Sequence, residues 1–275
     1  MTTLNEQLAT LIENFSPCDV SDALIKLQKT PEGSTARAGY LADLGKPSIQ
    51  ISPKPLSISS IIPPTHAHPP VPFSPTTGRN ETMHRIAAPA TTFKFLAKDV
   101  SPPSIATENP QKHGFPPDKH WVDHVGEFQA SDPSGAGSIV VIEQPDNQYC
   151  AVTGGIMATR MKALGIKATV VGGRVRDLKE LKATGLPIWA RATSTVGTNA
   201  EAKAGARDVS ISIGGVTVSP GDIIFCDPLE GVVAIPRELL GQMLELMPKL
   251  TTMDDKAKEA VAQGMSVTDA FKKFR

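Results

Sequence analysis

Three charged residues near the middle of the chain, Arg176, Asp177 and Glu180, have the types and the spacing of a site that binds an anion and a metal ion together. They follow the apolar run at 168–175, which predicts a parallel strand, and α/β proteins bind ligands at the carboxyl ends of such strands. Asp177 and Glu180 would share one face of a helical turn. There, one carboxylate could bind Mg²⁺ directly and the other through a bound water, while Arg176 could hold a substrate carboxylate in a bidentate fork.

A structural role explains the same two acids equally well. Asp177 could be the N-cap of a short helix over 178–185, and Glu180, three residues later, could complete an arrangement like a capping box. The spacing alone therefore leaves both a metal site and a helix cap open.

A pair of glycines, Gly154 and Gly155, opens the helix that is predicted just before that strand. The helix places four apolar residues on one face: Ile156, Met157, Met161 and Leu164. An isolated glycine pair is most often a tight strand-to-helix turn. The functional alternative is a helix N-terminus with accessible backbone N–H groups, which would suit a carboxylate or a phosphate. The glycine pair alone favours the structural explanation.

Other residues offer weaker sites. All six histidines lie between His66 and His124, and no acid or cysteine accompanies them at a recognisable metal-ligand spacing. The three cysteines are far apart and have no partner histidine in a nucleophile motif. Asp254 and Asp255 lie on a charged helix near the C-terminus, for which a solvated face is the simplest interpretation. No glycine-rich nucleotide-binding motif is present.

The composition excludes some classes of partner. The 28 Lys and Arg residues balance 28 Asp and Glu residues over 275 positions, so the overall charge gives no case for binding nucleic acid or an anionic membrane. No apolar run approaches the roughly 20 residues of a membrane span, and the N-terminus has no basic or apolar leader segment. Three distant cysteines suit a reducing compartment. The sequence predicts a soluble cytoplasmic protein that binds neither nucleic acid nor membrane.

The elements that must position the candidate residues follow from periodicity. Apolar residues at helical spacing predict a helix over 3–15, and a second helix begins after Ser16, a favourable N-cap. After residue 119, strands alternate with helices, which favours parallel pairing, and the strand-rich C-terminal third favours antiparallel pairing. Two helices are expected over 236–247 and 253–264. The fold class is α/β with a mixed sheet and flanking N- and C-terminal helices.

Proline sets the remaining boundaries. Of the 24 prolines, 15 lie within 47–117. Because proline lacks an N–H group, a stretch so rich in it cannot form a central sheet or a continuous helix. We expect a loop insert at about 63–80 and a second loop at about 101–118, with a strand at 85–98 between them. The whole chain, 1–275, is expected to form a single domain.

The spacing of the candidate site resembles a known pattern. Gly155, twenty intervening residues, Arg176-Asp177, two residues and Glu180 are similar to the G-x20-R-D-x2-E/D pattern of the RraA-like family, whose enzyme members are class II 4-hydroxy-4-methyl-2-oxoglutarate (HMG) aldolases. The likeness extends to three further segments: STVGTNAEAKAG (194–205), GGVTVSPGD (214–222) and CDPLEGVVAIP (226–236). The proline-rich insert departs from the compact bacterial members and looks like a fungal-type elaboration.

The resemblance implies a role for each site residue. The backbone amides of four residues would hold the pyruvate carboxylate: Gly154, Gly155, Ile156 and Met157. Arg176 would contact the keto-acid oxygens and favour the charge of an enolate. Asp177 would bind Mg²⁺ or Mn²⁺ directly, and Glu180 would hold a metal-bound water. An acid from the C-terminal helix of a neighbouring subunit, matched here by Asp254 or Asp255, would complete the site.

The resemblance also implies an activity and an assembly. The activity would be cleavage of HMG-type 4-hydroxy-2-keto acids to pyruvate through an enolate, with decarboxylation of oxaloacetate as a second reaction. The fold would be a swivelling-type sandwich similar to phosphohistidine domains, assembled as a homotrimer or hexamer. The alternative is the RraA-type regulator, which is not an enzyme and binds a ribonuclease and RNA helicases. These regulators lack the acid that follows Arg-Asp, so Glu180 favours the enzyme.

Overall fold

The computed structural model describes residues 2–28, 38–42, 44, 84–125 and 137–275. These ranges form a mixed α/β structure with a multi-stranded sheet and flanking helices, which confirms the predicted fold class. The proline-rich insert expected at 63–80 lies outside the described residues. Within the described ranges, no helix combines the length and the apolar character needed to cross a membrane.

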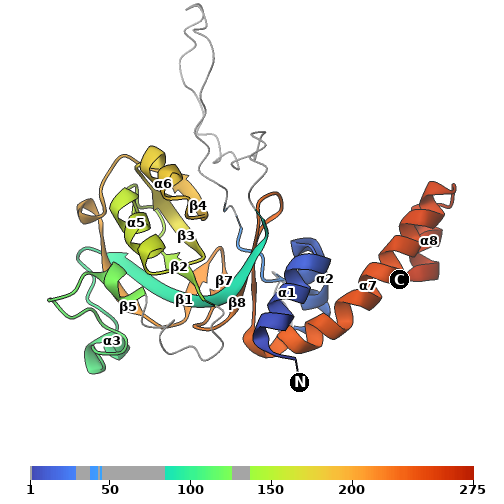
Figure 1. The fold of residues 1–275 in the computed structure, drawn as a ribbon, viewed down its shortest axis with the longest axis horizontal. Helices are drawn as coiled ribbons and strands as arrows, with labels where there is room; N and C mark the ends of the chain where they lie inside the picture. The colour runs from blue at the N-terminus through green and yellow to red at the C-terminus, as the bar shows by residue number, and fades with distance from the viewer. Residues whose placement is uncertain (1, 29–37, 43, 45–83, 126–136) are drawn as a thin grey trace, which may run out of the picture.

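A seven-stranded mixed sheet forms the centre of the molecule (Figure 1). The strand order is β4-β3-β2-β1-β8-β9, and β5 also pairs with β1. The strands are β1 (Ile86–Ala97), β2 (Ile139–Glu143), β3 (Ala168–Val175), β4 (Ile188–Thr193), β5 (Ala202–Arg207), β8 (Ile223–Asp227) and β9 (Gly231–Ile235). Strands β1 to β4 are parallel, whereas β5, β8 and β9 pair antiparallel with their neighbours, as the sequence predicted. A separate hairpin consists of β6 (Ile211–Ile213) and β7 (Val216–Val218).

Helices cover the sheet in two groups. The first group is α5 (Gly155–Ala163) and α6 (Leu178–Thr184), which follow β2 and β3 in the chain. The second group lies against β8 and β9 and consists of α1 (Leu4–Asn14), α2 (Pro17–Leu27) and α7 (Leu240–Ala262). Figure 1 shows the last part of α7, with α8 (Val267–Phe274), projecting away from the sheet. Ser16 caps α2 as predicted, because its side chain accepts from the Asp19 N–H.

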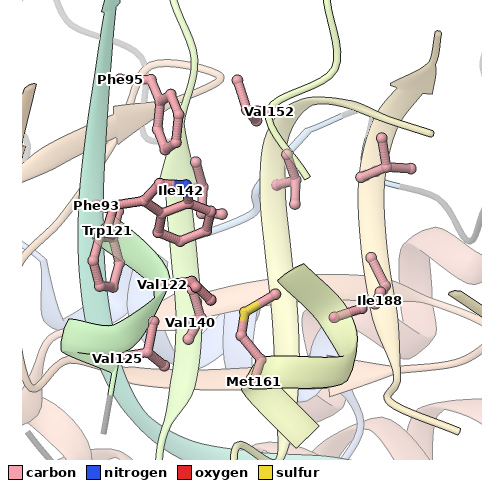
Figure 2. Close-up of a cluster of buried hydrophobic side chains, with 14 of the residues drawn as sticks. Phe93, Phe95, Trp121, Val122, Val125, Val140, Ile142, Val152, Met161 and Ile188 are labelled. Carbon is pink, nitrogen blue, oxygen red and sulfur yellow. The ribbon is translucent and has the colours of Figure 1, made fainter. Parts of the chain in front are cut away.

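The parallel part of the sheet is buried on both faces. Along β2, Val140 and Ile142 pack under α5 and α6, while Ile139 and Val141 belong to the cluster on the opposite face. An uninterrupted apolar run of this kind is typical of a parallel strand covered on both sides. Figure 2 shows the first cluster, in which the Trp121 and Phe93 rings pack edge-to-face with their centroids 5.4 Å apart. These clusters fix the strands whose carboxyl ends carry the candidate site.

The strand predicted at 85–98 is the central strand β1, although it contains Pro89. Residues Ile86 to Pro89 pair with β8, and pairing with β2 begins at Ala90. Pro89 therefore lies where the strand changes partners, and a residue without an N–H group is tolerated at such a position.

Four elements differ from the sequence prediction. The two helices expected over 236–247 and 253–264 are one helix, α7, which continues through Pro248. The short helix α3 (Ser104–Glu108) lies inside the loop expected at 101–118. The strand β5 and the helix α8 were not predicted. In β5 the sequence AKAGAR has low strand propensity, so its pairing with β1 outweighs its local preference.

Candidate active site

Strand pairing brings the glycine pair next to the Arg-Asp pair. Thr153 forms a parallel bridge with Val175 at the carboxyl end of β3, and the Arg176 N–H donates to the Thr153 carbonyl at 3.0 Å. Gly154 and Asp177 are therefore close on two adjacent segments. Ligands of α/β proteins bind outside the carboxyl ends of parallel strands. The structure thus brings the two halves of the predicted site together at the edge that the fold class favours.

Asp177 turns its carboxylate toward the start of α5 and does not cap its own helix. It occupies the N-cap position of α6, yet its side chain makes no cap hydrogen bond; Asp177 Oδ2 accepts from the Gly155 N–H at 3.2 Å. Its backbone is left-handed, with φ 58°. Asp tolerates this conformation better than most residues, although it still costs free energy. Asp177 is thus the N-cap residue of α6 in position, as the helix-cap explanation predicted, but its side chain makes no cap hydrogen bond, and a strained backbone directs the carboxylate to another helix.

Glu180 approaches the same helix start from α6. A methyl group on Gly155 would overlap Glu180 Oε2, and one on Gly154 would lie 2.5 Å from Asp177 Oδ2. Neither glycine has a positive φ. Glycine is therefore required at both positions because a side chain would not fit there, and not because the backbone adopts an unusual conformation. The pair makes the strand-to-helix turn that the structural explanation describes. It also admits two carboxylates to the first turn of α5.

Arg176 supplies positive charge beside these acids. Its side chain is 43% exposed, and its Nε lies 3.4 Å from Asp177 Oδ2. A methyl group on Gly197 would lie 2.9 Å from Arg176 Nη1, so the loop that follows β4 packs directly against the guanidinium group. Arg176 is therefore held between Asp177 and Gly197 and remains accessible to a ligand.

The first turn of α5 offers backbone N–H groups to an anion, and one of them, the Gly155 N–H, already donates to Asp177 Oδ2. Its N-cap, Gly154, has no side chain that could accept a hydrogen bond from the turn. Ile156 is 76% exposed at this end of the helix, whereas Met157 packs against the cluster under α5 and α6. Helix N-termini carry unsatisfied N–H groups and a partial positive charge, which favour carboxylates and phosphates. The four residues predicted to bind a substrate carboxylate thus lie together at this end.

Asp177 and Glu180 fit a hard divalent cation. Both are carboxylates at least partly exposed to solvent, and both reach the start of α5. Mg²⁺ prefers oxygen ligands and is commonly held by one or two carboxylates, with waters and substrate as the other ligands. The part of the chain that the structure describes contains no group of three or more His, Cys, Asp or Glu side chains that could hold a metal ion. A metal at this site would therefore depend on two acids, water and substrate.

Asp254 and Asp255 lie elsewhere in the single chain. Both belong to α7, which Figure 1 places well away from α5 and α6. Asp254 pairs with Arg275, whose hydrogen bond holds the pKa of the Asp254 carboxyl below its usual value. Asp255 pairs with Lys258 at 3.4 Å on the exposed face of the helix. The solvated-face interpretation describes Asp255 well, and only a second subunit could bring either acid to the site.

The loop between β4 and β5 borders the site, although no motif in its sequence predicted a role for it. The Val196 carbonyl accepts from the Ala151 N–H at 2.8 Å, and Thr198 Oγ1 donates to the Ala151 carbonyl at 2.7 Å. The Ser194 N–H also donates to the Val175 carbonyl. The loop thus joins the segment before Gly154 to the end of β3. The sequence signal for this loop was Gly197 within a polar run. Nothing in the neighbouring residues indicates that Gly197 contacts the Arg176 side chain.

Comparison with known proteins identifies relatives. The family model described as "RraA-like: Aldolase/RraA" matches residues 67–234. A protein of Halalkalibacterium halodurans, named "Putative 4-hydroxy-4-methyl-2-oxoglutarate aldolase", is 30% identical over 149 residues, which are 54% of this chain and 70% of that protein.

Two solved structures share the fold. An uncharacterized protein from Pseudomonas syringae pv. tomato superposes with a TM-score of 0.63 at 20% identity, over all of this chain and 96% of that one. RraAS2 of Streptomyces coelicolor, described as an unusual member of the RNase ES inhibitor RraA protein family, gives a TM-score of 0.58 at 17% identity and covers 96% of this chain and 99% of that one. At these identities the likeness concerns the fold alone. The family model covers more than half of the chain and includes every residue of the site at β3 and α5, so the chain belongs to the RraA-like family.

Proposed function

We propose that this protein is a divalent-metal-dependent class II aldolase, which cleaves 4-hydroxy-2-keto acids such as HMG to pyruvate. One observation carries the proposal: the carboxylates of Asp177 and Glu180 both reach the first turn of α5, beside Arg176. An anion-binding helix N-terminus, two oxygen ligands and a guanidinium group are the parts that a chelating 2-keto acid requires. The aldolase name of the H. halodurans relative supports the same reaction class.

The reaction breaks the bond between C3 and C4 of the substrate. As the 4-hydroxyl group loses its proton, the electron pair of this bond moves to C3 and the 2-keto oxygen, which gives a pyruvate enolate. C4 becomes the keto carbon of the second product, and a proton added at C3 completes the first pyruvate. Oxaloacetate, on losing CO₂, forms the same enolate, so we propose decarboxylation as a second activity.

The chain's own residues would bind the substrate and stabilise the developing charge. The amides around Gly154 and Gly155 would hold the carboxylate, and Arg176 would contact the enolate oxygen, where fixed positive charge lowers the barrier. Asp177 and Glu180 would hold Mg²⁺ or Mn²⁺, which supplies Lewis-acid polarisation of the keto group when bound. The rotation of Asp177 away from its own helix suits this role.

Several finer features belong to the same proposal. We propose a swivelling-type sandwich like that of phosphohistidine domains, a fungal-type insert, a single domain and a cytoplasmic location. The assembly would be a homotrimer or hexamer, in which Asp254 or Asp255 of a neighbouring chain approaches the site. Neither nucleic acid nor membrane would be a partner.

The second candidate function is that of an RraA-type regulator of ribonuclease and helicase partners. The fold likeness to RraAS2 is the observation that favours it. The regulator function gives no role to the two carboxylates at the start of α5. Glu180 and the space that Gly155 provides for it therefore favour the enzyme.

Pyruvate release, followed through coupled lactate dehydrogenase, tests the two functions. We expect release from HMG and from oxaloacetate with Mg²⁺ and none with EDTA. Asp177→Asn should lose about 100-fold or more in kcat, because one metal ligand is removed while Asn still tolerates the left-handed backbone. Asp99→Asn, a change at an exposed turn after β1, is the matched control. A folded, metal-loaded protein that releases no pyruvate would favour the regulator.

A further inference from the structure

Glu201 binds the segment that leads into the glycine pair. Its carboxylate accepts from the backbone N–H groups of Tyr149 and Cys150, both at 2.7 Å. Its carbonyl accepts from Gln148 Nε2 at 3.0 Å. Short hydrogen bonds to a charged acceptor are among the stronger ones in proteins. One residue of the loop before β5 thus makes three contacts with three consecutive residues of the segment before α5.

Glu201 is itself fixed to the sheet. It directly precedes β5, and its carbonyl also accepts from the Lys98 N–H at the end of β1. On the segment that it holds, Cys150 and Val152 are buried in the cluster under α5 and α6, while Tyr149 is 68% exposed. The segment is therefore held on one side by the buried Cys150 and Val152 and on the other side by the Glu201 carboxylate.

Arg174 completes the arrangement from β3. Its guanidinium group donates to the carbonyls of Gln148 and Thr193 and lies over the Tyr149 ring at 5.5 Å. The Arg174 carbonyl accepts from the Val152 N–H. The two backbone amides lower the pKa of the Glu201 carboxyl, Cys150 more than Tyr149, so that the charged form persists.

We propose that Glu201 is a positioning residue of the active site, whose carboxylate fixes the backbone that presents the Gly154 and Gly155 amides to the substrate. This inference rests on the proposed function for its catalytic consequence. Glu201 touches neither Asp177 nor Glu180 in any described contact, so it would affect binding of the substrate carboxylate more than binding of the metal. Only four residues separate Cys150 from Gly155, so a displacement at Cys150 is passed to the helix start.

The kinetic test compares Glu201→Ala and Glu201→Gln with the wild type. We expect Glu201→Ala to raise KM for oxaloacetate about 10-fold with a smaller change in kcat, because small misplacements of binding groups cost one to two orders of magnitude. Glu201→Gln keeps an acceptor oxygen and should recover part of the loss. Mn²⁺ affinity, titrated by electron paramagnetic resonance, should stay unchanged. Glu245→Ala, at an exposed position of α7, is the control.

Amide hydrogen exchange separates this inference from the proposed function. In Glu201→Ala, exchange should become faster in peptides that cover 149–157 and stay unchanged in β3, whether or not the protein is an aldolase. Wild-type kinetics and wild-type protection in Glu201→Ala would overturn the inference, and so would a loss of protection spread over the whole sheet. A wild-type protein without pyruvate release, combined with local loss of protection in the variant, would refute the proposed function and leave the positioning role intact.

Discussion

Replacing Gly155 by alanine tests the contact between the start of α5 and Glu180. The added methyl group would overlap Glu180 Oε2 and would lie 2.7 Å from the Glu180 Cβ and 2.9 Å from its Cδ. The carboxylate end of a glutamate can rotate away, but its Cβ moves only with the backbone of α6. The two helices must therefore shift apart to admit the new methyl group.

The size of the effect follows from two opposing contributions. Overpacking of this kind costs about 1–3 kcal/mol, whereas replacing glycine by alanine in a helix gains up to about 1 kcal/mol. We expect Gly155→Ala to lower the free energy of unfolding by about 1–2 kcal/mol. If Glu180 is first replaced by glycine, no Cβ opposes the methyl group. The same change should then raise the free energy of unfolding by up to about 1 kcal/mol.

Urea denaturation of four proteins measures this change of sign: the wild type, the two single variants and the double variant. The difference between the two Gly155→Ala effects should be about 2–3 kcal/mol, within the range known for residues in contact. Gly241→Ala is the control, because among the described residues the nearest atom outside its own helix, Gln7 Nε2, lies 4.0 Å from the methyl group that it adds. If Gly155→Ala costs the same with and without Glu180, the close approach that defines the site is wrong.

Two further changes test other parts of the molecule. Gly197→Ala should push the flexible end of Arg176 and raise KM for oxaloacetate about 10-fold with little loss of stability. Gly241→Ala should leave this KM unchanged. Equal KM values in wild type and Gly197→Ala would contradict the packing of Gly197 on Arg176. Arg275 lowers the pKa of the Asp254 carboxyl in the folded protein. The ion pair therefore stabilises the fold at pH values above the Asp254 pKa of the unfolded chain, and this stabilisation is lost as the pH falls through the lower pKa of the folded protein. Asp254→Asn should therefore cost about 0.5 kcal/mol at neutral pH and nothing in strong acid, as measured by urea denaturation.

Local chemistry made much of the fold predictable. Ser16 identified the start of α2, and the apolar run at 168–175 identified β3, because capping and two-sided burial leave clear patterns in sequence. β5 was missed because its Ala, Gly and Lys residues become a strand only by pairing with β1. α7 was divided in two because Pro248 suggests a helix end, although the helix continues through it.

The family resemblance named the members of the candidate site but not its geometry. It assigned Gly154 and Asp177 to one site, and the structure has these two residues adjacent. The direction of the Asp177 side chain could not be predicted, because capping its own helix was an equally good local solution. The contributions of Gly197 and Glu201 come from a loop remote in sequence, and no local signal links a glycine or a glutamate to a partner that far away.

The charges at the site argue for a divalent cation. Asp177 and Glu180 direct two negative charges to the first turn of α5, and Arg176 brings one positive charge. The proposed substrates are dicarboxylates and would add two further negative charges, and a substrate carboxylate would compete with Asp177 Oδ2 for the Gly155 N–H. Like charges about 4 Å apart at a protein surface repel each other by about 1–4 kcal/mol. The site would then repel the anion that its amides attract, unless a cation held by the two acids neutralises them and draws Asp177 away from the amide. The acids that obstruct a simple anion site are the ones that suit a metal-dependent reaction of a keto acid.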